Sequence, residues 1–535
     1  MQKNLLKIAI RVDANDQIGG GHFRRCFSLA EEIKARGHTA LFISTSLPLK
    51  LRQMLKTSGF NYKVLEPSAK TQKILKPESY SVYENWLELP KAQDAKGTRE
   101  VLEKFKPNWV IFDNYALDFE WVTIVRKNLD RVSFLAIDDL DNRNLGADFL
   151  LDQTSLRKRK RKYKSVAFLE GPTFTLLTKN FRELRTQSIL ERSIRQSRNC
   201  IGKKFCILIS VGMYDPKKIM PYLLRATAII ENVQIDVAMS SDSQTLSQIR
   251  KLAKVYANIN LHLDKSDISF LMLKADLCIG ATGMSTWERC CMGLPTLTIA
   301  IAQNQRNLTK ELKKINAAKV TTITQAKSKK NLYNTVSNLV NSPEILKKLS
   351  KNSKNLCDGF GAKRVMDFLE ANLRSVKTTD SRKLLTWRNK SFVREMSLDK
   401  KTLSEKEHRK WMQKTQNVLK GIWLIYSEGN VEIGHCNSVF ISKNEVFWSF
   451  YIGENSFSKG SGKRMLAFFL KQLFYEKGIK TINAKVLNQN FKSKLVHQHL
   501  GFSCINKSKE YSTYSLSRTK FECRFYKPYE TKNYT

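Results

Sequence analysis

Short apolar runs alternate with helical patterns over the first 375 positions of the chain. The segment LLKIAIRV (5–12) has the length of a buried strand and ends in the glycine-rich turn DANDQIGGGH. Apolar residues then recur at helical spacing from Cys26 to Ile33, with Gly37 as the stop, and TALFIS (39–44) predicts a second strand. A strand, a glycine loop, a helix and a strand form a βαβ unit, and a series of such units builds a parallel sheet.

The same alternation continues in two groups of apolar strands. They are predicted at 107–115, 132–140 and 147–153, and then at 204–212, 233–240, 275–283 and 294–302. Helical segments after Asn307 would close the second group. The grouping predicts two α/β halves, over residues 1–175 and 176–375.

The pattern changes after Ser375. A helical pattern, then a strand, a turn and two more strands follow one another over residues 387–453. A glycine loop then opens a long amphipathic helix, and TINAKVL (481–487) predicts a further strand. We therefore expect a separate α+β domain over residues 376–520, followed by a tail over 521–535.

The composition limits what such a chain can be. Its 535 residues correspond to three or four domains at about 150 residues each. Hydrophobic residues make up 42% and aromatic residues 10%, which excludes a disordered chain or a fibre. The formal net charge of +43 fits either phosphate-bearing ligands or an abundance of solvated lysines. The run RKRKRKYK (157–164) is predicted to be a solvated loop, with nucleic-acid or membrane binding as the alternative.

Signals for targeting, membrane spanning and metal binding are missing from the sequence. No apolar stretch reaches 18 residues, and the first residues, MQKNLLKIAIRVD, lack the features of a signal peptide. The ten cysteines include no CxxC pair, and the adjacent Cys290 and Cys291 suit neither a disulfide framework nor a zinc site. We therefore expect a reduced, cytoplasmic protein with no transmembrane segment and no metal.

The first glycine loop carries a single histidine. Gly19, Gly20 and Gly21 precede His22 at the point where the first strand leads into a helix. Glycines allow a ligand to approach the backbone, and a helix N-terminus offers free N–H groups to anions. A neutral imidazole at this edge of an α/β sheet can accept a proton from water. The alternative is a histidine that only packs or caps the helix.

A matching loop lies in the second half of the chain. Gly280 and Gly283, followed by Ser285 and Thr286, form a loop of amides and hydroxyls that opens a helix, with Glu288 in its first turns. Such a loop fits a pyrophosphate, and the carboxylate can hold ribose hydroxyls. The alternative is an ordinary capped helix with an acidic first turn.

Several segments together resemble one enzyme family. RVDANDQIGGGHFRRCFSLAEEIKARGH, FDNYALDFEW, IDDL, LLDQ, LEGPTFTLL, ATGMSTWERCCMGLPTL and AQNQ occur in the expected order within residues 1–375. This set resembles the UDP-2,4-diacetamido-2,4,6-trideoxy-β-L-altropyranose hydrolases of the pseudaminic-acid pathway. The resemblance implies a GT-B-like pair of Rossmann-type domains that binds a UDP-amino-sugar. It also implies metal-independent release of UDP, with water attacking the anomeric carbon.

The resemblance assigns roles to individual residues. His22 matches the catalytic histidine of the family, and Asp13 is assigned a catalytic role beside it. Met213 and Met284 stand where the family usually has smaller residues. The residues implied to bind the substrate are Gly20, Gly21, Arg25, Tyr115, Asp118, Gly283, Ser285, Thr286, Glu288, Asn304 and Gln305.

A further glycine loop, SKGSGK (458–463), follows the strand FWSFYIG. Its amides can bind a pyrophosphate, although an ordinary turn is the alternative. With TWRNKSFVREM, EHRKW and NAKVLNQNFKSKLVHQHLGF, residues 380–515 resemble the GNAT enzyme of the same pathway, which acetylates the 4-amino group of the UDP-sugar.

This second resemblance implies acetyl-CoA as cosubstrate. His497 stands where the family often has a tyrosine that protonates the departing thiolate, and Phe457 stands where an Arg or Gln is usual. A histidine can donate a proton as well. The residues implied to bind the cofactor are Lys459, Gly460, Gly462, Lys463, Asn488, Asn490 and Ser493.

The sequence thus predicts a bifunctional enzyme of nonulosonic-acid synthesis, in which acetylation precedes hydrolysis. No nucleic-acid partner is expected. One alternative is a GT-B glycosyltransferase that passes the sugar to an acceptor, since fold alone does not separate the two activities. The GGGH loop and the NYALD motif favour hydrolysis. A second alternative is a basic nucleic-acid- or membrane-binding protein.

Overall fold

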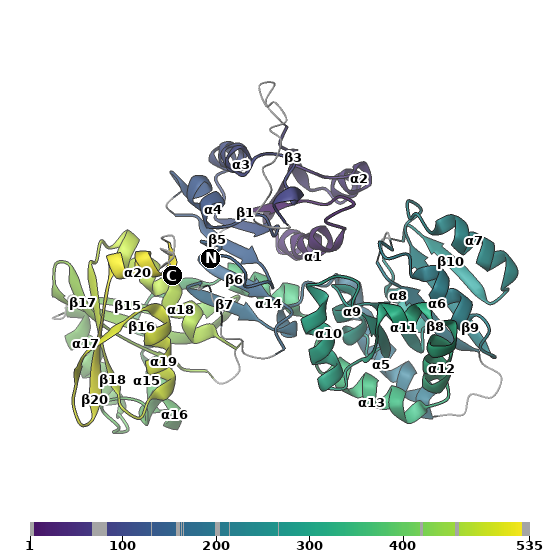
Figure 1. Ribbon diagram of the computed structural model, residues 1–535. Helices are drawn as coiled ribbons and strands as arrows, with labels where there is room; N and C mark the ends of the chain where they lie inside the picture. Colours follow the sequence, from purple (N-terminus) through teal and green to yellow (C-terminus); the bar gives the residue numbers. More distant parts are fainter. Residues whose placement is uncertain are drawn as a thin grey trace, which may run out of the picture.

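A computed structural model of the chain contains three sheets, one in each of three domains (Figure 1). The structure describes residues 5–66, 83–129, 131–156, 161, 163, 165–197, 204–212, 215–265, 267–417, 421–454 and 459–526. The predicted pair of Rossmann-type domains and the α+β domain that follows them are confirmed. Met213, Phe457 and most of the run 157–164 lie outside the described residues.

The first domain is built on a parallel sheet with the order β3-β2-β1-β4-β5-β6-β7. The order reverses between β1 and β4, so the carboxyl ends of these two strands form the switch point at which ligands bind in such sheets. Its strands are β1 (Lys7–Val12), β2 (Thr39–Ser44), β3 (Asn61–Val64), β4 (Trp109–Asp113), β5 (Ser133–Ile137), β6 (Phe149–Asp152) and β7 (Ala167–Glu170). Its helices are α1 (Gly21–Ala35), α2 (Leu49–Thr57), α3 (Lys91–Phe105) and α4 (Phe119–Arg126), with 3-10 turns η1 (Glu84–Trp86) and η2 (Pro172–Phe174).

The second domain repeats this plan with the order β10-β9-β8-β11-β12-β13 and a switch point between β8 and β11. Its strands are β8 (Phe205–Ser210), β9 (Val233–Met239), β10 (Ile259–Leu263), β11 (Leu277–Ala281), β12 (Thr296–Ile299) and β13 (Lys319–Thr321). Its helices are α5 (Lys179–Ser197), α6 (Met220–Thr227), α7 (Leu246–Val255), α8 (Ser269–Lys274), α9 (Ser285–Cys291), α10 (Gln305–Lys314), α11 (Ile323–Lys327), α12 (Lys329–Val340) and α13 (Pro343–Lys354).

Helix α14 (Gly361–Leu369) follows the second domain in sequence but packs on the first. Its Phe368 contacts Trp109 and Phe149, with ring centroids 5.4 and 4.9 Å apart. Glu370, just after the helix, accepts hydrogen bonds from Arg36 and pairs with His38 of the first domain. The chain therefore crosses back to the first domain before it enters the third.

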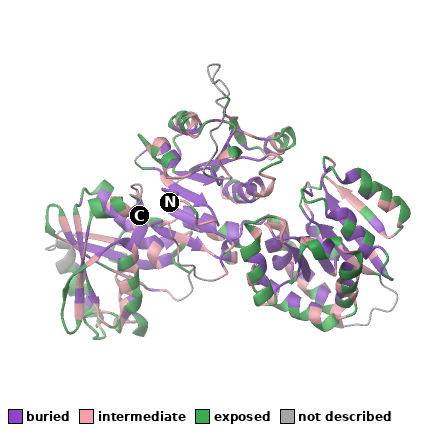
Figure 2. Cartoon of the chain, in the orientation of Figure 1, coloured by how far each residue is buried: buried purple, intermediate pink, exposed green. Residues whose placement is uncertain are grey.

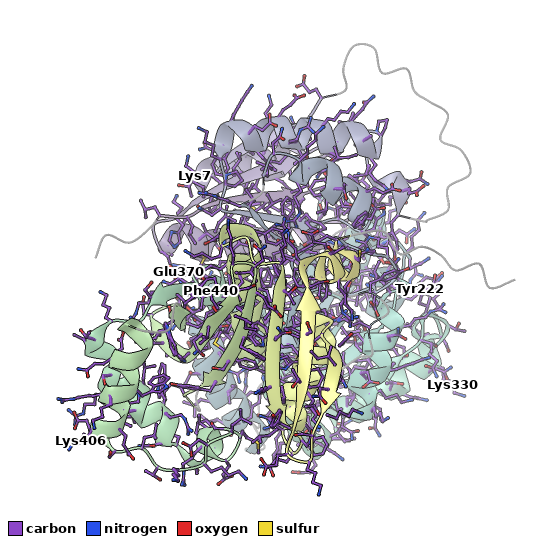
Figure 3. The ribbon with its side chains drawn as sticks, turned by 90° about the vertical axis from the view of Figure 1, so that its left-hand side faces the viewer. Lys7, Tyr222, Lys330, Glu370, Lys406 and Phe440 are labelled. Atoms are coloured by element: carbon purple, nitrogen blue, oxygen red, sulfur yellow. The ribbon has the colours of Figure 1, made fainter. Side chains whose placement is uncertain are left out.

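The third domain has a mixed sheet with the order β14-β15-β16-β17-β18-β20-β19. Its strands are β14 (Asn372–Ser375), β15 (Gly421–Glu428), β16 (Val431–Ser442), β17 (Glu445–Ile452), β18 (Thr481–Leu487), β19 (Ser503–Lys507) and β20 (Tyr511–Ser517). Its helices are α15 (Ser381–Asn389), α16 (Ser391–Arg394), α17 (Glu405–Asn417), α18 (Ser461–Lys471), α19 (Phe491–Leu500) and α20 (Arg518–Phe525), with η3 (Thr378–Asp380) and the π-helical η4 (Gln472–Glu476). In Figure 3 the helix that carries Lys406 flanks these strands.

Both ends of this domain extend beyond the boundaries expected from sequence. Strand β14 pairs with β15, so the sheet begins at Asn372 rather than at 376. Helix α20 buries Phe521 and Phe525, which pack on one another at 5.1 Å. The core therefore continues into the segment that the sequence predicted as a tail.

The third domain packs directly against the first. Phe468 of α18 lies 5.4 Å from Phe149 and 6.3 Å from Trp109 between ring centroids. The β5–β6 connection contains no helix, so α14 and α18 cover this part of the sheet instead. Figure 2 shows buried residues continuing from one domain into the other. The two domains share one hydrophobic core.

Candidate active sites

His22 lies at the switch point of the first domain, where the first strand leads into α1. Its Nδ1 is 2.6 Å from Oδ1 of Asp113, the last residue of β4. Arg25, one turn further along α1, donates from Nε to Oδ2 of Asp113 at 2.5 Å. Burial alone would raise the pKa of Asp113, but Arg25 and His22 outweigh it and hold this pKa well below its usual range.

Oδ1 of an ionised Asp113 is placed to accept a hydrogen bond from Nδ1 of His22, and Nη2 of Arg25 lies 3.2 Å from the same nitrogen. Nε2 of His22 then carries a lone pair, and none of the hydrogen bonds between described residues uses it. This is the arrangement that prepares an imidazole to accept a proton from a bound molecule. The single histidine of the glycine loop therefore has the geometry of a general base.

Aromatic rings enclose the other side of the His22 imidazole. Trp86 and Tyr115 meet it edge-on, with centroids 5.4 and 4.8 Å away, and they stack on each other at 5.2 Å. Tyr115 donates from its hydroxyl to Asp139 at 2.5 Å. Burial raises the pKa of Asp139, and Asp152 and Asp138 raise it further against the opposing charge of Arg25.

Asp13 and Asp118 form hydrogen bonds with the loops and the helix next to the His22 site. Asp13 is fully buried, with Oδ1 accepting from the amide of Thr45 at 2.8 Å and Oδ2 accepting from Asn114 at 2.8 Å. Arg11 pairs with it at 2.7 Å. Asp118 caps α4 by accepting from two backbone amides, and it pairs with Lys91 at 2.6 Å. Their oxygens hold loops in place, which is a positioning role.

The glycine loops of the two halves face each other. A Cβ built on Gly21 would lie 3.7 Å from Cγ of Met284, the residue before α9. Glu288 of α9 is half-buried; burial raises its pKa, and Arg24 of α1 opposes that rise. Gly21 of the first loop therefore lies against Met284 of the second, and Arg24 lies near Glu288.

The remaining residues predicted for this half have local partners. Thr286 accepts from the amide of Gly283 at 3.1 Å, and Ser285 accepts from Arg289 at 2.9 Å. Gln305 accepts from the amide of Ile301, while its Nε2 lies 3.8 Å from where a Cβ on Gly283 would be. Asn304 is exposed just before α10. Gln305 thus lies at the glycine loop, whereas Asn304 is exposed to solvent.

The third domain contains an opening between two strands. β17 and β18 pair in parallel only from Glu445 to Phe447 and from Thr481 to Asn483. Beyond Phe447 the two strands are not paired with each other, although each keeps its outer neighbour. Free backbone groups face this opening, and an extended ligand with amide groups can bind them as an added strand.

A glycine loop lies at the start of α18. Gly460 has a φ of +92°, a conformation that side chains rarely adopt, and it caps the helix. Gly462 and Lys463 occupy the first turn, and the amide of Lys463 donates to the carbonyl of Gly460 at 3.0 Å. Lys459 is exposed beside them. These four predicted residues therefore share one helix N-terminus.

His497 is buried and hydrogen-bonded at both nitrogens. Trp448 donates from Nε1 to its Nε2 at 3.1 Å, and its Nδ1 donates to the carbonyl of Ser493 at 2.8 Å. Burial lowers its pKa to about 4, and the Ser493 carbonyl opposes this shift. The ring is therefore neutral, and its proton is held by the backbone, which is the geometry of a structural residue.

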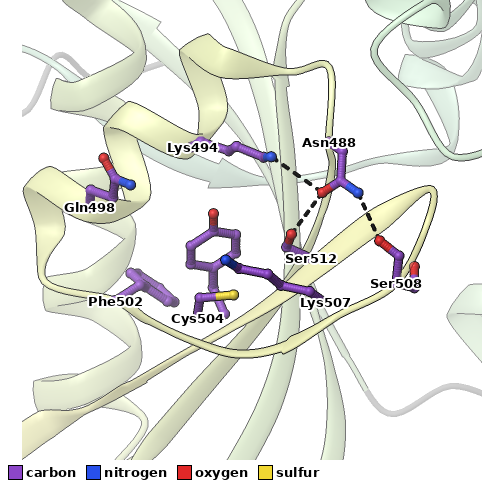
Figure 4. Close-up of a pocket in the computed structure, with 9 residues that line it drawn as sticks. Asn488, Lys494, Gln498, Phe502, Cys504, Lys507, Ser508 and Ser512 are labelled. Atoms are coloured by element: carbon purple, nitrogen blue, oxygen red, sulfur yellow. Dashed lines mark hydrogen bonds between the residues drawn. The ribbon is translucent and has the colours of Figure 1, made fainter.

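Asn488 and Asn490 organise the segment before α19. Asn490 caps the helix by accepting from the amide of Ser493 at 3.0 Å. Asn488 donates to the carbonyl of Ser508 at 2.9 Å and accepts from Ser512 at 2.7 Å (Figure 4). It lines a pocket of about 540 Å³ between α19 and the β19–β20 edge. This pocket is separate from the β17–β18 opening.

Within the described part of the chain, no group of three or more His, Cys, Asp or Glu side chains is placed to hold a metal ion. Among the described helices, none has both the length and the apolar character needed to span a bilayer.

Comparison with known proteins separates the third domain from the first two. Residues 373–516 match the family model described as acetyltransferase (GNAT) domain. An uncharacterized protein of Methanocaldococcus jannaschii is 21% identical over 542 residues, covering 94% of this chain and 98% of that protein. The spore coat polysaccharide biosynthesis protein SpsG of Bacillus subtilis is 24% identical over 218 residues, covering 40% of this chain and 61% of that protein.

Two solved structures resemble separate parts of the chain. MurG of Acinetobacter baumannii matches with a TM-score of 0.47 and 15% identity, covering 68% of this chain and 99% of that one. The Campylobacter jejuni N-acetyltransferase PseH matches with a TM-score of 0.23 and 18% identity, covering 28% of this chain and 98% of that one. The chain thus joins a pair of Rossmann-type domains to a third domain that matches the acetyltransferase (GNAT) domain model.

Sequence reasoning missed several residues around His22. Asp113 and Asp139 belong to the quoted segments FDNY and IDDL, yet neither was assigned a role. Both lie at the carboxyl ends of strands on one side of the switch point, and that position is the signal that could have found Asp113. Trp86 and Arg24 carried no such signal, because only the folded chain brings them to the site.

Proposed function

We propose that this protein is a bifunctional enzyme of pseudaminic-acid (nonulosonic-acid) synthesis. Its first two domains hydrolyse a UDP-2,4-diacetamido-2,4,6-trideoxy-altropyranose to UDP and free sugar. Its third domain transfers an acetyl group from acetyl-CoA to the amine of the UDP-sugar precursor. The His22–Asp113 pair at the meeting point of two glycine loops is the observation that carries the hydrolase assignment.

In the hydrolase step, water attacks the anomeric carbon of the sugar. Nε2 of His22 takes the proton of that water, Asp113 stabilises the resulting imidazolium, and the bond between the anomeric carbon and the diphosphate oxygen breaks. UDP leaves with the electron pair of that bond. Glu288 and the Gly283 loop bind the nucleotide side, while Tyr115 borders the sugar.

In the acetyltransferase step, acetyl-CoA enters the opening between β17 and β18. Its pantetheine amides pair with the free strand edges, and its pyrophosphate binds the amides around Gly460 and Gly462. Support comes from the match of residues 373–516 to the GNAT domain and from a PseH structure solved with acetyl coenzyme A. The match to SpsG, named for polysaccharide biosynthesis, supports a sugar pathway.

The cytoplasmic location is part of the proposal. Both cosubstrates are anionic metabolites, which suits a chain of net charge +43. All nine described cysteines are free thiols, and this supports a reducing compartment.

The hydrolase assignment is tested by incubating the full chain with the UDP-diacetamido sugar and no acceptor. We expect UDP release, with the free sugar identified by NMR, and a loss of about 100-fold or more in His22→Ala. Folding of the variant is checked by its UDP affinity. UDP release that appears only when an acceptor alcohol is added would instead establish a GT-B glycosyltransferase.

A further inference from the structure

A cluster of aromatic and imidazole rings lies on the face of the third sheet that α15 and α17 cover. His435 of β16 is paired in register with Tyr451 of β17, and their rings lie 5.3 Å apart. On its other side His435 stacks on Trp423 of β15 at 5.9 Å. Trp411 of α17 meets Trp423 edge-on at 5.2 Å. We call these four residues the Trp423–His435 cluster.

Nε2 of His435 is a buried polar atom that has no hydrogen-bond partner among the residues that the structure describes. The exposed fraction of His435 is 3%, and within the same described residues the buried Nε1 of the neighbouring Trp423 also has no partner. Leaving a buried polar group unpaired destabilises a protein by about 1–3 kcal/mol, so such groups call for an explanation. By contrast, His497 and His499 of the same domain both have hydrogen bonds.

The cluster borders the opening proposed for acetyl-CoA. Tyr451 lies on the part of β17 that has separated from β18, which occurs beyond Phe447. His435 occupies the next strand at the same level. A thioester lying along the free edge of β17 therefore has Tyr451 and His435 on the face below α17. The opposite face is filled by His497, Trp448 and their aromatic neighbours.

The charges around the Trp423–His435 cluster favour an uncharged ligand. Burial, and after it His408 of α17, lowers the pKa of His435 to about 3, so the imidazole is uncharged at neutral pH. The other titratable and charged groups beside the ring are Tyr451, whose pKa is raised by burial, and Arg388 of α15. Two carboxylates border this face, but Glu432 of β16 is paired with Lys383 of α15, and Glu454 is paired with Lys390. An ammonium ion would therefore lose its hydration here without gaining an unpaired counter-charge, whereas a neutral amine would not.

We propose that the Trp423–His435 cluster is the binding site for the acceptor amine, with His435 as its positioning residue. The neutral amine donates one N–H to the lone pair of the His435 imidazole, and its own lone pair then points at the thioester carbonyl. The cluster thereby selects the nucleophilic, uncharged form of the amine. This inference rests on the acetyltransferase function proposed above.

The reaction that follows needs no further reactant. A bond forms between the amine nitrogen and the acetyl carbonyl carbon, while the bond from that carbon to sulfur breaks. The electron pair leaves on the thiolate of coenzyme A, and the displaced proton of the amine passes to solvent. His435 stays neutral throughout and acts only by orienting the amine.

The test measures acetyl transfer by the full chain to the UDP-4-amino sugar, with CoA thiol release as the readout. His435→Phe removes the lone pair but keeps a buried ring, and His435→Gln restores an acceptor oxygen. We expect His435→Phe to raise KM for the amine at least tenfold while KM for acetyl-CoA stays within about twofold. His435→Gln should recover part of the loss. His262→Phe, in the second domain, is the matched control and should behave as wild type.

Two outcomes overturn the inference while leaving the acetyltransferase intact. The first is an unchanged KM for the amine in His435→Phe. The second is a wild-type KM for the amine that does not fall as pH rises through the pKa of the amine, because the site would then bind the ammonium form. Transfer to no amine by the wild type would contradict the acetyltransferase proposal itself. An unchanged KM for acetyl-CoA shows that the third domain of the variants is folded.

Discussion

Nδ1 of His22 lies 2.6 Å from Oδ1 of Asp113, although 91 positions separate the two residues along the chain. The strand order explains the contact. β1 and β4 are neighbours at the switch point, so the loop after β1 and the last residue of β4 meet at one edge of the sheet. The same edge faces the glycine loop of the second domain.

The His22–Asp113 contact predicts the effect of an isosteric change. Asp113→Asn should lower kcat for UDP release by about 100-fold with little change in KM, because an amide no longer fixes the proton of His22 on Nδ1. Steady-state kinetics measures this, with Glu103→Gln on the exposed face of α3 as the control. An equal loss of kcat in Asp113→Asn and in Glu103→Gln would argue against a catalytic role for the His22–Asp113 pair.

Glu288 is predicted to bind the nucleotide rather than to act in the chemistry. Its replacement by Ala should raise Kd for UDP about tenfold, since a hydrogen bond to a charged group is lost. Calorimetric titration measures the change, and Glu344→Gln, whose side chain is 83% exposed, serves as the control. An unchanged Kd would remove Glu288 from the UDP site.

His497 is predicted to stabilise the third domain without moving a proton. His497→Gln should leave kcat for acetyl transfer within about threefold and lower the free energy of unfolding by about 1 kcal/mol. The folded pKa of about 4 lies below the ordinary 6.5, so the stabilisation by neutral His497 is complete above pH 6.5 and is lost as pH falls toward 4. The variant should lack this part of the acid sensitivity.

The contrary result for His497 is equally specific. A kcat reduced by about 100-fold with an unchanged unfolding midpoint would mark it as the proton donor to the thiolate. The pH dependence of unfolding, followed by fluorescence, separates the two roles.

Asp148 is predicted to hold the first and third domains together. It is buried between them, accepting from Tyr526 at 2.5 Å and pairing with Lys471 at 3.4 Å. Against the effect of burial, Arg126 and Lys471 lower its pKa from 3.8 to about 2. A depressed carboxyl pKa stabilises the fold above pH 4, and that contribution disappears as pH falls toward 2.

Asp148→Asn should therefore lower the free energy of unfolding by about 2 kcal/mol at pH 7. The difference from wild type should shrink between pH 4 and pH 2. Denaturant titration measures both, with the exposed Glu231→Gln as the control. A variant as stable as wild type at pH 7 would show that Asp148 does not stabilise the interface.

The sequence predicted the elements that carry long apolar runs or glycine loops. β1, α1, β11 and the β15–β16 hairpin all appeared near their predicted positions. β3 and β13 were not predicted from the sequence. They have only four and three residues and lie at sheet edges, where half-exposed side chains leave no apolar run. Short edge strands depend on pairing with a neighbour rather than on their own pattern.

Contacts between distant segments could not be predicted in the same way. The sequence places Phe468 on the apolar face of the predicted helix α18, but it does not indicate that this side chain packs on Phe149 of another domain. The strand order was needed to predict the pairing of His22 with Asp113. The packing of β15, β16 and β17 was needed to predict that Nε2 of His435 has no hydrogen-bond partner among the described residues. Sequence motifs located the loops, and the topology then selected the partners.

Hydrolysis in ¹⁸O-labelled water tests the central claim most directly. If water attacks the anomeric carbon as His22 takes its proton, the label enters the sugar and the released UDP contains none. Mass spectrometry of UDP gives a clear answer, because its phosphate oxygens do not exchange with water. Label in UDP would show cleavage at phosphorus, and an absence of turnover without an added acceptor would show a transferase; either result would contradict the account.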